Sequence, residues 1–306
     1  MSSDPRLAVH VGGVDLRNPI LLASGTCGYG MDMAEVLDLK KVGGFLTKGI
    51  SVEPRGGNPP PRVVETPSGM LNAIGLQNVG VDAFISDKLP GIRKLPLKCI
   101  ANVYGNTFDD YVTLAEMLGD LDGVDAIELN LSCPNVKQGG VEFGQDPEVL
   151  GRLVATVLKK SRCPVWVKLS PNVADVRPFV QASEEAGADA VTLINTLRGM
   201  EINIHKRLPV LGNVSGGLSG PAIRPVALYQ VYRAAEVAKG DVIGMGGIET
   251  WEDVIRFVLA GAKAVEVGTA LFRTPSAPEA MVSGLSQYLE QTGDASILDL
   301  VNQARV

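Results

Sequence analysis

The stretch DVIGMGGIETWEDVIRFVLAGAKAVEVGTA, residues 241–270, decides the fold class of this 306-residue chain. It begins with a short apolar run, turns through glycines, continues as a helical pattern over 250–259 and returns to an apolar run after Gly261. Both runs are almost continuously hydrophobic, as in strands that are covered on both faces, and glycine commonly follows the end of a helix. The stretch therefore predicts a strand–helix–strand unit of a parallel sheet.

The same unit recurs along the chain. The apolar runs are PILLASG (19–25), GFLTKGI (44–50), LKCIANV (97–103), AIELNLS (126–132), VWVKLS (165–170), AVTLINT (190–196), DVIGMGG (241–247) and AVEVGTA (264–270). The helical patterns cover 33–41, 107–118, 147–160, 173–186, 221–238 and 250–259. Eight strands that alternate with helices predict an α/β fold, a single (β/α)8 TIM barrel over residues 1–306. A doubly wound open sheet is the structural alternative.

Two kinds of segment fall outside this alternation. Before the first strand, LAVHVGGVDLRNP predicts a hairpin around Gly12 and Gly13 that closes the bottom of the barrel. Three long connections, at about 51–96, 133–146 and 197–220, follow the carboxyl ends of strands. Barrel enzymes place their chemistry at that end, so we expect these long loops to be functional.

Composition excludes several classes of protein. Hydrophobic residues make up 45% and charged residues 20%, which are values of a globular chain. A net charge of −6 without a long basic run argues against nucleic acid as a partner. The four cysteines show no C-x-x-C spacing, so we expect no metal site in this chain. We also expect no signal peptide and no membrane segment, and hence a cytoplasmic protein with reduced thiols.

Polar side chains interrupt the apolar runs near their carboxyl ends. They are Ser24, Lys48, Asn102, Glu128, Asn130, Lys168, Asn195 and Thr269. Any one of them alone is most simply a hydrogen-bonded structural group. Their repetition at one end of successive strands is different, and buried lysines are rare unless they are paired. The convergence of Lys48 and Lys168 with several amides predicts an anionic ligand rich in carbonyl groups.

Glycine-rich turns add the signal of a phosphate site. GMGGIET (244–250) and VGTALFR (267–273) run from a strand through glycine into a helical pattern, and VSGGLSGPAI (214–223) precedes another helix. Backbone N–H groups at such turns bind phosphate, commonly after strands seven and eight of a barrel. The alternative is that these glycines serve only tight turns. Glu249 stands where a dinucleotide fingerprint needs its third glycine, and no P-loop occurs.

Cys133 is the most suggestive single residue, because NLSCPN places it just past the fourth strand. A free cysteine is more often a small buried hydrophobe, and we interpret Cys27, Cys99 and Cys163 in that way. His10 and His205 belong to distant segments, so a Cys–His pair is poorly supported. A base that acts without histidine must be tuned by nearby cations or hydrogen bonds.

Six motifs together resemble the class 1 dihydroorotate dehydrogenases, in order along nearly the whole chain. They are TKGI (47–50), NAIGLQN (72–78), NLSCPN (130–135), VKLSPN (167–172), GMGGI (244–248) and VGTAL (267–271). Members of class 2 are membrane-associated and have serine where Cys133 stands. Within class 1, NAIGLQN is similar to the B type, the catalytic subunit coupled to NAD. The A type, which uses fumarate, tends to have Ser-x-Gly-Leu-Pro after its asparagine.

The resemblance implies that FMN lies across the carboxyl-end mouth of the barrel. Its phosphate would be bound by Gly220, Gly246, Gly247, Gly268 and Thr269. Its ring would contact Ser24, Lys48, Gly49, Asn102, Asn130, Lys168 and Ile194. A lysine near the N1 and O2 atoms of the flavin could stabilise the negative charge of the reduced ring.

The resemblance also implies the substrate and the reaction. Dihydroorotate would be held by Lys48, Asn72, Ala73, Ile74, Gly75, Leu76, Asn130, Asn135, Asn195 and Thr196. Cys133 would remove a proton from C5 while a hydride passes from C6 to flavin N5, which yields orotate in de novo pyrimidine biosynthesis. A cysteine suits this role because its unperturbed pKa of about 8.5 is close to working pH.

In the B type, electrons continue to NAD, yet the chain offers neither a dinucleotide fingerprint nor a cysteine cluster. The resemblance therefore implies a partner, an electron-transfer subunit with FAD and a [2Fe–2S] cluster, in a heterotetramer of two catalytic and two electron-transfer chains. The alternatives are an A-type, fumarate-dependent enzyme and a flavin-free phosphate-binding barrel lyase or isomerase. A barrel without catalytic activity is disfavoured, because Lys48, Asn72, Cys133, Lys168 and Asn195 are all present.

Overall fold

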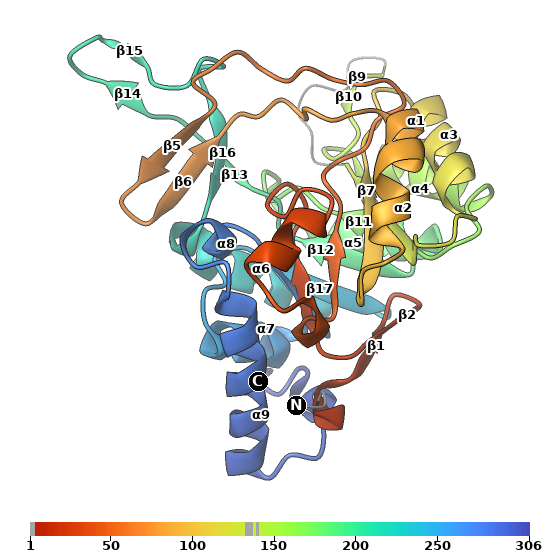
Figure 1. The fold of residues 1–306 in the computed structure, drawn as a ribbon, viewed down its shortest axis with the longest axis vertical. Helices are drawn as coiled ribbons and strands as arrows, with labels where there is room; N and C mark the ends of the chain where they lie inside the picture. The colour runs from red at the N-terminus through yellow and green to blue at the C-terminus, as the bar shows by residue number, and fades with distance from the viewer. Residues whose placement is uncertain (1–3, 132–136, 139–140) are drawn as a thin grey trace.

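The computed structural model describes residues 4–131, 137–138 and 141–306. Parallel strands form a closed barrel with helices around it (Figure 1). Each barrel strand pairs with the next barrel strand along the chain, and the last barrel strand pairs with the first. The barrel strands are β3 (Ile20–Leu22), β4 (Gly44–Leu46), β7 (Lys98–Val103), β8 (Ala126–Asn130), β11 (Val165–Lys168), β12 (Ala190–Leu193), β17 (Asp241–Met245) and β18 (Ala264–Val267). All eight predicted strands are present, so the predicted TIM barrel is confirmed and the open sheet is excluded.

Helices surround the barrel. They are α1 (Val81–Ala83), α2 (Leu89–Ile92), α3 (Phe108–Leu118), α4 (Pro147–Leu158), α5 (Arg177–Glu185), α6 (Arg224–Ala235), α7 (Trp251–Ala260), α8 (Ala270–Arg273) and α9 (Ala277–Thr292). A π-helical segment, Phe84–Lys88, joins α1 to α2, and 3-10 helices cover Pro5–Leu7, Met31–Glu35, Leu39–Lys41, Pro221–Ile223 and Ile297–Leu300. No helix in the described part of the chain is both long and apolar enough to cross a membrane.

The helix predicted over 33–41 is wrong. The segment forms two short 3-10 helices instead, Met31–Glu35 and Leu39–Lys41. Asp38 lies between them in an extended conformation, and its carboxylate accepts a hydrogen bond from the Lys40 backbone N–H. A side chain that caps a new helical turn in this way interrupts a continuous helix. The other five predicted helices are present, with ends that differ from the predicted bounds by up to four residues.

The predicted N-terminal hairpin closes the bottom of the barrel. Strands β1 (Val9–Val11) and β2 (Val14–Leu16) pair antiparallel around Gly12 and Gly13, whose φ angles are +52° and +77°. Trp166 Nε1 donates to the Gly12 carbonyl, and the Gly12 N–H donates to the Asp241 carboxylate, each at 2.8 Å. A Cβ atom on Gly12 would lie 2.2 Å from Trp166 Nε1, so this close approach requires glycine.

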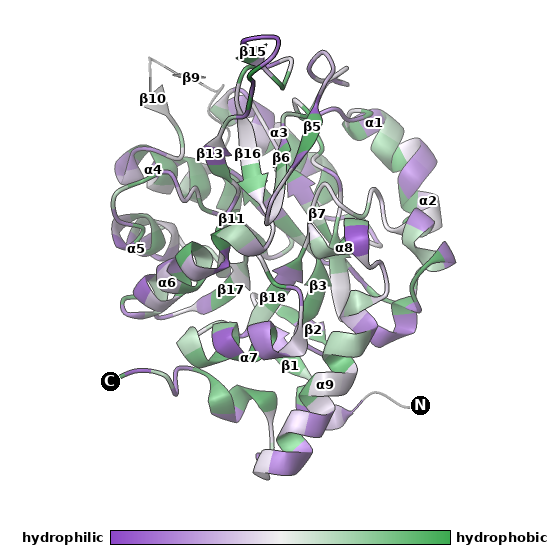
Figure 2. Ribbon diagram, turned by 90° about the vertical axis from the view of Figure 1, so that its left-hand side faces the viewer, coloured by the Kyte–Doolittle hydropathy of each residue, from purple (hydrophilic) through white to green (hydrophobic). Residues whose placement is uncertain are grey.

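The long connections gather at the opposite end of the barrel from this hairpin (Figure 2). Two of them build one antiparallel sheet in the order β13-β16-β6-β5. Its strands are β5 (Val63–Thr66), β6 (Gly69–Asn72), β13 (Leu197–Gly199) and β16 (Gly216–Ser219), and a hairpin of β14 (Ile202–Asn203) and β15 (Leu208–Pro209) extends from it. The short strands β9 (Lys137–Gln138) and β10 (Val141–Glu142) belong to the third connection. This arrangement brings residues 72–76, 195–196 and 216–220 to the mouth of the barrel.

Candidate active site at the carboxyl end of the barrel

Four buried polar side chains from four strands meet inside the barrel. Asn102 of β7 is paired in register with Glu128 of β8, and its Nδ2 donates to Glu128 Oε2 at 2.5 Å. Lys168 ends β11, and its Nζ lies 3.7 Å from Glu128 Oε2 and 3.4 Å from Glu266 Oε2 of β18. Relative exposure is 0% for Asn102 and Glu128, 1% for Glu266 and 3% for Lys168. We call these four residues the lysine cluster.

Burial and mutual charge set the protonation of the lysine cluster. Burial lowers the pKa of Lys168, but the nearby carboxylates of Glu128 and Glu266 together outweigh it, so the net shift is upward. Burial raises the pKa of Glu266 far above its usual value, Glu128 raises it further, and Lys168 opposes this only in part. A buried site with two carboxyls and one ammonium group is neutral when one carboxyl keeps its proton. Both shifts favour the protonated forms, which are the ammonium group of Lys168 and the neutral carboxyl of Glu266.

Sequence reasoning missed the role of Glu266 and gave Glu128 no function. The available signal was the same as for Lys168, because Glu266 is the single charged residue in the apolar run AVEVGTA.

Within the described part of the chain, Asn102 Oδ1 is a buried acceptor that no donor reaches. A Cβ atom on Gly49 would lie 3.3 Å from this oxygen, so the segment after β4 passes directly beside it.

A layer of amides lies next to the lysine cluster. Asn130 ends β8 level with Lys168 in the sheet register. Asn195 Nδ2 donates to Asn130 Oδ1 at 3.3 Å, and the Thr196 N–H donates to Asn195 Oδ1 at 2.7 Å. Tyr111 OH donates to the Asn130 carbonyl at 2.9 Å. The structure thus brings together three of the residues predicted to bind substrate.

Residues 72–76 form a backbone segment held by amide side chains. Asn58 Nδ2 donates to the Ala73 carbonyl at 3.0 Å, and the Asn58 N–H donates to the Ile74 carbonyl at 3.0 Å. Asn78 Nδ2 donates to the Leu76 carbonyl at 2.9 Å. Asn72 ends β6, and its Nδ2 donates to the Gly217 carbonyl at 3.4 Å. The segment is therefore fixed in place from both sides.

Lys48 follows β4 and precedes the residue that approaches this segment. A Cβ atom on the next residue, Gly49, would lie 3.9 Å from Leu76 Cδ2. Burial lowers the pKa of Lys48, and the positive charge of nearby Arg62 lowers it further.

Three glycine turns pack together at the other side of the mouth. Gly220, Gly246 and Gly247 have φ angles of +94°, +120° and +73°. A Cβ atom on Gly247 would lie 2.7 Å from the Gly220 carbonyl oxygen, so the two turns touch. Thr269 Oγ1 donates to Ser219 Oγ at 2.8 Å, which joins the turn after β18 to the same site.

The remaining predicted residues border these turns. A Cβ atom on Gly268 would lie 3.3 Å from Ala23 Cβ, next to Ser24 at the end of β3. Ile194 is buried after β12, with its Cγ1 3.4 Å from the Cβ position of Gly246. Cys133 and Asn135 lie outside the described residues. Every other residue that the sequence assigned to the site lies at the carboxyl end of the barrel.

The cysteines outside the NLSCPN motif behave as packing residues. Cys27 and Cys99 are buried, and Cys163 is partly buried. Burial raises the pKa of Cys27 to about 12 and also raises the pKa of Cys99 and Cys163. Such thiols are poor nucleophiles and poor bases at neutral pH. The interpretation of these three cysteines as small hydrophobes is confirmed.

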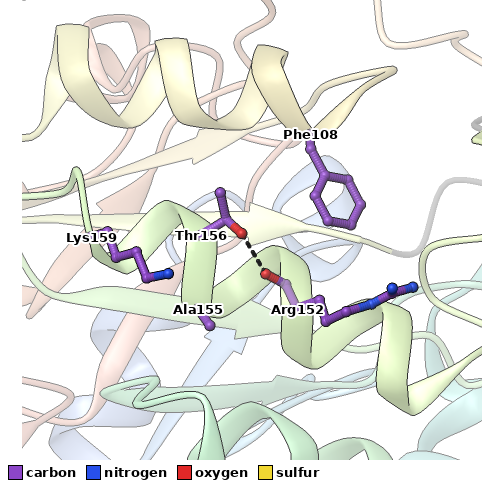
Figure 3. Close-up of a pocket in the computed structure, with 5 residues that line it drawn as sticks. All are labelled: Phe108, Arg152, Ala155, Thr156 and Lys159. Atoms are coloured by element: carbon purple, nitrogen blue, oxygen red, sulfur yellow. Dashed lines mark hydrogen bonds between the residues drawn. The ribbon is translucent and has the colours of Figure 1, made fainter.

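A shallow pocket of about 430 Å³ lies outside the barrel, between α3 and α4 (Figure 3). It is lined by Phe108, Arg152, Ala155, Thr156 and Lys159. The Thr156 hydroxyl donates to the Arg152 carbonyl at 2.7 Å and is therefore occupied within its own helix. None of the residues that the sequence assigned to the site lines this pocket.

The fold and the mouth together define a TIM-barrel protein with glycine turns at its mouth and a buried lysine paired with two glutamates. The family model described as dihydroorotate dehydrogenase matches residues 6–289. The dihydroorotate dehydrogenase B (NAD(+)) catalytic subunit of Geotalea uraniireducens is 54% identical over 297 residues, 97% of each chain. That of Pelobacter propionicus is 51% identical and covers 97% of this chain and 98% of its own. The chain belongs to the dihydroorotate dehydrogenase family.

A solved structure of dihydroorotate dehydrogenase from Eimeria tenella, in complex with ferulenol, superimposes with a TM-score of 0.82. The sequences are 23% identical, and the match covers 99% of this chain and 90% of that one. This likeness supports the barrel fold. The family predicted from the six motifs is confirmed, and the curated relatives favour the B type over the A type.

Proposed function

We propose that this chain oxidises dihydroorotate to orotate, a step of de novo pyrimidine biosynthesis, and that residues 1–306 form one FMN-binding barrel domain. The observation that carries the proposal is the convergence at one mouth of a charged lysine, an amide layer and glycine turns. This combination suits a phosphate-bearing flavin and a substrate with a carboxylate, amides and carbonyls.

The residues at the mouth fit FMN. Gly220, Gly246, Gly247, Gly268 and Thr269 would hold the phosphate through backbone N–H groups and a hydroxyl. Ser24, Lys48, Gly49, Asn102, Asn130, Lys168 and Ile194 would line the ring site. The buried Asn102 Oδ1 supplies an acceptor that suits the single N–H of the flavin pyrimidine ring. When bound, FMN accepts the two electrons and the hydrogen that leave C6 of dihydroorotate.

Lys168 holds positive charge beside the flavin ring. Its ammonium group is fixed by Glu128 and Glu266, so it is in place before the ring gains electrons. A preorganised charge stabilises developing negative charge without the cost of reorienting groups during the reaction. The lysine cluster thus favours the reduced state of the cofactor.

Dihydroorotate is held on the other side of the mouth. The carboxylate of the substrate relieves the repulsion between Lys48 and Arg62, which gives this position a preference for an anion. Asn72, Asn130, Asn135, Asn195 and Thr196 supply donors and acceptors for the ring amides, and the backbone of 73–76 completes the site. Fixed donors and acceptors orient the ring for transfer from C6.

Cys133 removes the proton from C5. The assignment rests on its position in the sequence, three residues after the end of β8. Lys168 is level with Asn130 at that strand end, and a nearby positive charge favours the thiolate form that a base requires. The other three cysteines are buried or partly buried, with raised pKa values.

Electrons then pass to NAD through a separate electron-transfer subunit that carries FAD and a [2Fe–2S] cluster, in a cytoplasmic heterotetramer of two chains of each kind. The curated relatives are named as catalytic subunits, which supports a division of labour between two polypeptides.

The acceptor test separates the alternatives. The purified chain should contain a flavin that absorbs at about 450 nm. It should oxidise dihydroorotate with an artificial dye as the acceptor but not with NAD. Addition of the electron-transfer subunit should confer NAD reduction. Rapid fumarate reduction by the chain alone would identify the A type, and a colourless chain that binds no flavin would favour the barrel lyase or isomerase.

A further inference from the structure

Another buried carboxylate lies behind the glycine turns. Asp253, in the first turn of α7, is 1% exposed. Its Oδ2 accepts the backbone N–H groups of Glu249 and Thr250, at 3.0 and 3.2 Å. Its Oδ1 accepts Nη1 of Arg224 at 2.6 Å and Nη1 of Arg256 at 2.9 Å. Both oxygens of this carboxylate are fully used.

These bonds join two parts of the proposed phosphate site. Glu249 and Thr250 follow Gly246 and Gly247 after one intervening residue, Ile248, whereas Arg224 begins α6, four residues after Gly220. A Cβ atom on Gly247 would lie 2.7 Å from Arg224 Cβ and 2.8 Å from Arg224 N. Asp253 thus fixes the turn after β17 against the start of α6 at the place where their backbones touch.

We propose that Asp253 is a positioning residue for the phosphate of the cofactor: it holds the two glycine turns together so that one phosphate meets both. The inference rests on the proposed binding of FMN. Asp253 acts through Arg224 and through the backbone of residues 249–250. Its carboxylate lies behind the turns and is already saturated with donors, so it has no free oxygen for a ligand.

The direction of the change in FMN affinity distinguishes a positioning role of Asp253 from a purely electrostatic effect of its charge. Loss of a negative charge beside a phosphate site would strengthen the binding of an anion by Coulomb attraction. Loss of the bonds that fix the two turns would weaken it, because the N–H groups would no longer be held in one arrangement. Asp253→Asn removes the charge while keeping the size of the side chain, so the two effects act in opposite directions.

The chain contains a matched control in α3. Asp110 Oδ2 accepts the N–H groups of Asn106 and Thr107, at 2.7 and 3.1 Å, which is the same cap that Asp253 makes on α7. In the described part of the chain, Asp110 pairs with no arginine. Helix α3 follows β7 and does not border the glycine turns. Asp110→Asn therefore removes the charge of an equivalent capping side chain without changing a residue of the glycine turns.

The test is a titration of the flavin-free full chain with FMN, followed by the quenching of flavin fluorescence. Asp253→Asn should raise the Kd for FMN about tenfold or more, as expected for lost hydrogen bonds to charged groups. It should leave the Kd for riboflavin, which lacks the phosphate, almost unchanged. Asp110→Asn should leave both Kd values within about twofold of the parent.

A second pair of variants keeps the proposal testable if Asp253→Asn does not fold. Arg224→Gln cuts the bond between elements, whereas Arg256→Gln cuts a bond within α7, from i to i+3. Only Arg224→Gln should weaken FMN binding. Unchanged or tighter FMN binding in both Asp253→Asn and Arg224→Gln would overturn the proposal, as would an equal loss in Asp110→Asn. If the parent chain itself bound no FMN, the proposed function would fail instead.

Discussion

The ammonium group of Lys168 lies 3.4 Å from a carboxylate oxygen of Glu266, and both side chains are almost completely buried inside the barrel. A carboxylate oxygen of Glu128 lies 3.7 Å from the same ammonium group. Burial and the neighbouring Glu128 raise the pKa of Glu266 well above its usual value, which favours the neutral carboxyl. This arrangement holds Lys168 charged at the position where the flavin ring is proposed to lie.

The protonated state of Glu266 predicts a pH dependence of stability. Its pKa in the folded chain lies well above the value of about 4.3 for an unfolded glutamate, so the folded chain holds one more proton above that pH. The free energy of unfolding should therefore decrease as pH rises above about 4.3, by up to about 1.4 kcal/mol per pH unit from this group.

Glu266→Gln removes the ionisation and keeps the shape of the neutral side chain. Denaturant unfolding between pH 5 and 8, with FMN at constant excess, should show a flatter pH dependence in this variant than in the parent. Glu185→Gln, at an exposed position of α5, is the control and should keep the slope of the parent. Equal slopes in all three proteins would mean that Glu266 is ionised.

Removal of the buried cation should change the flavin more than the substrate. Lys168→Ala should lower the two-electron midpoint potential of the bound flavin by about 30 mV or more, because the reduced ring loses a stabilising charge. A spectroelectrochemical titration measures this shift. Lys98→Ala is the control, because Lys98 starts β7 at the bottom of the barrel and pairs there with Asp125. An unchanged potential in Lys168→Ala would remove this lysine from the flavin site.

Lys48→Ala should change substrate binding more than it changes the flavin. The variant should retain FMN, whereas its KM for dihydroorotate should rise by about tenfold or more, as expected for the loss of a charged partner of a carboxylate. Steady-state kinetics with an artificial dye measure the change. The exposed Lys40, far from the mouth in the 3-10 helix before β4, provides the control variant Lys40→Ala. A normal KM together with lost flavin would reverse the assignments of the two lysines.

The buried thiols should resist alkylation. Cys27, with a pKa of about 12, and Cys99 are both buried, so the folded chain at pH 8 should leave them unmodified by iodoacetamide. The partly buried Cys163 should react faster than either. Peptide mass spectrometry gives the order of labelling, and the unfolded chain, in which all cysteines react, is the control. Early labelling of Cys27 would contradict its burial.

Much of the fold could be predicted because its signals are local. Each barrel strand is a continuous apolar run, and the polar residues at the carboxyl ends of the strands predicted that Lys168, Asn130 and Asn195 lie together, as the structure shows. The antiparallel sheet beyond the barrel could not be predicted. Its central pairing joins Asn72 of β6 to Gly217 of β16, and contacts between such distant residues leave no periodic pattern in either segment.

The sequence did not indicate the roles of Glu266 and Asp253, and the physical reason is the same for both. Glu266 and Asp253 act through neighbours that only the fold brings close, namely Lys168 for the first and Arg224 for the second. A glutamate in an apolar strand is visible in the sequence, but its partner is not. The helix predicted at 33–41 failed for a local reason, because Asp38 caps a separate turn. The assignments of Cys133 and Asn135 remain predictions.

Anaerobic mixing of the flavin-containing chain with dihydroorotate tests the central claim most directly. The flavin absorption of the parent should bleach rapidly, with orotate formed in an equal amount, in the absence of any partner subunit or other acceptor. Cys133→Ser should retain FMN but bleach about 10² to 10⁴ times more slowly at neutral pH, because a hydroxyl is a much weaker base catalyst than a thiolate. A parent flavin that stays oxidised would contradict the proposed reaction, and a Cys133→Ser variant that bleaches as fast as the parent would remove Cys133 from the role of base.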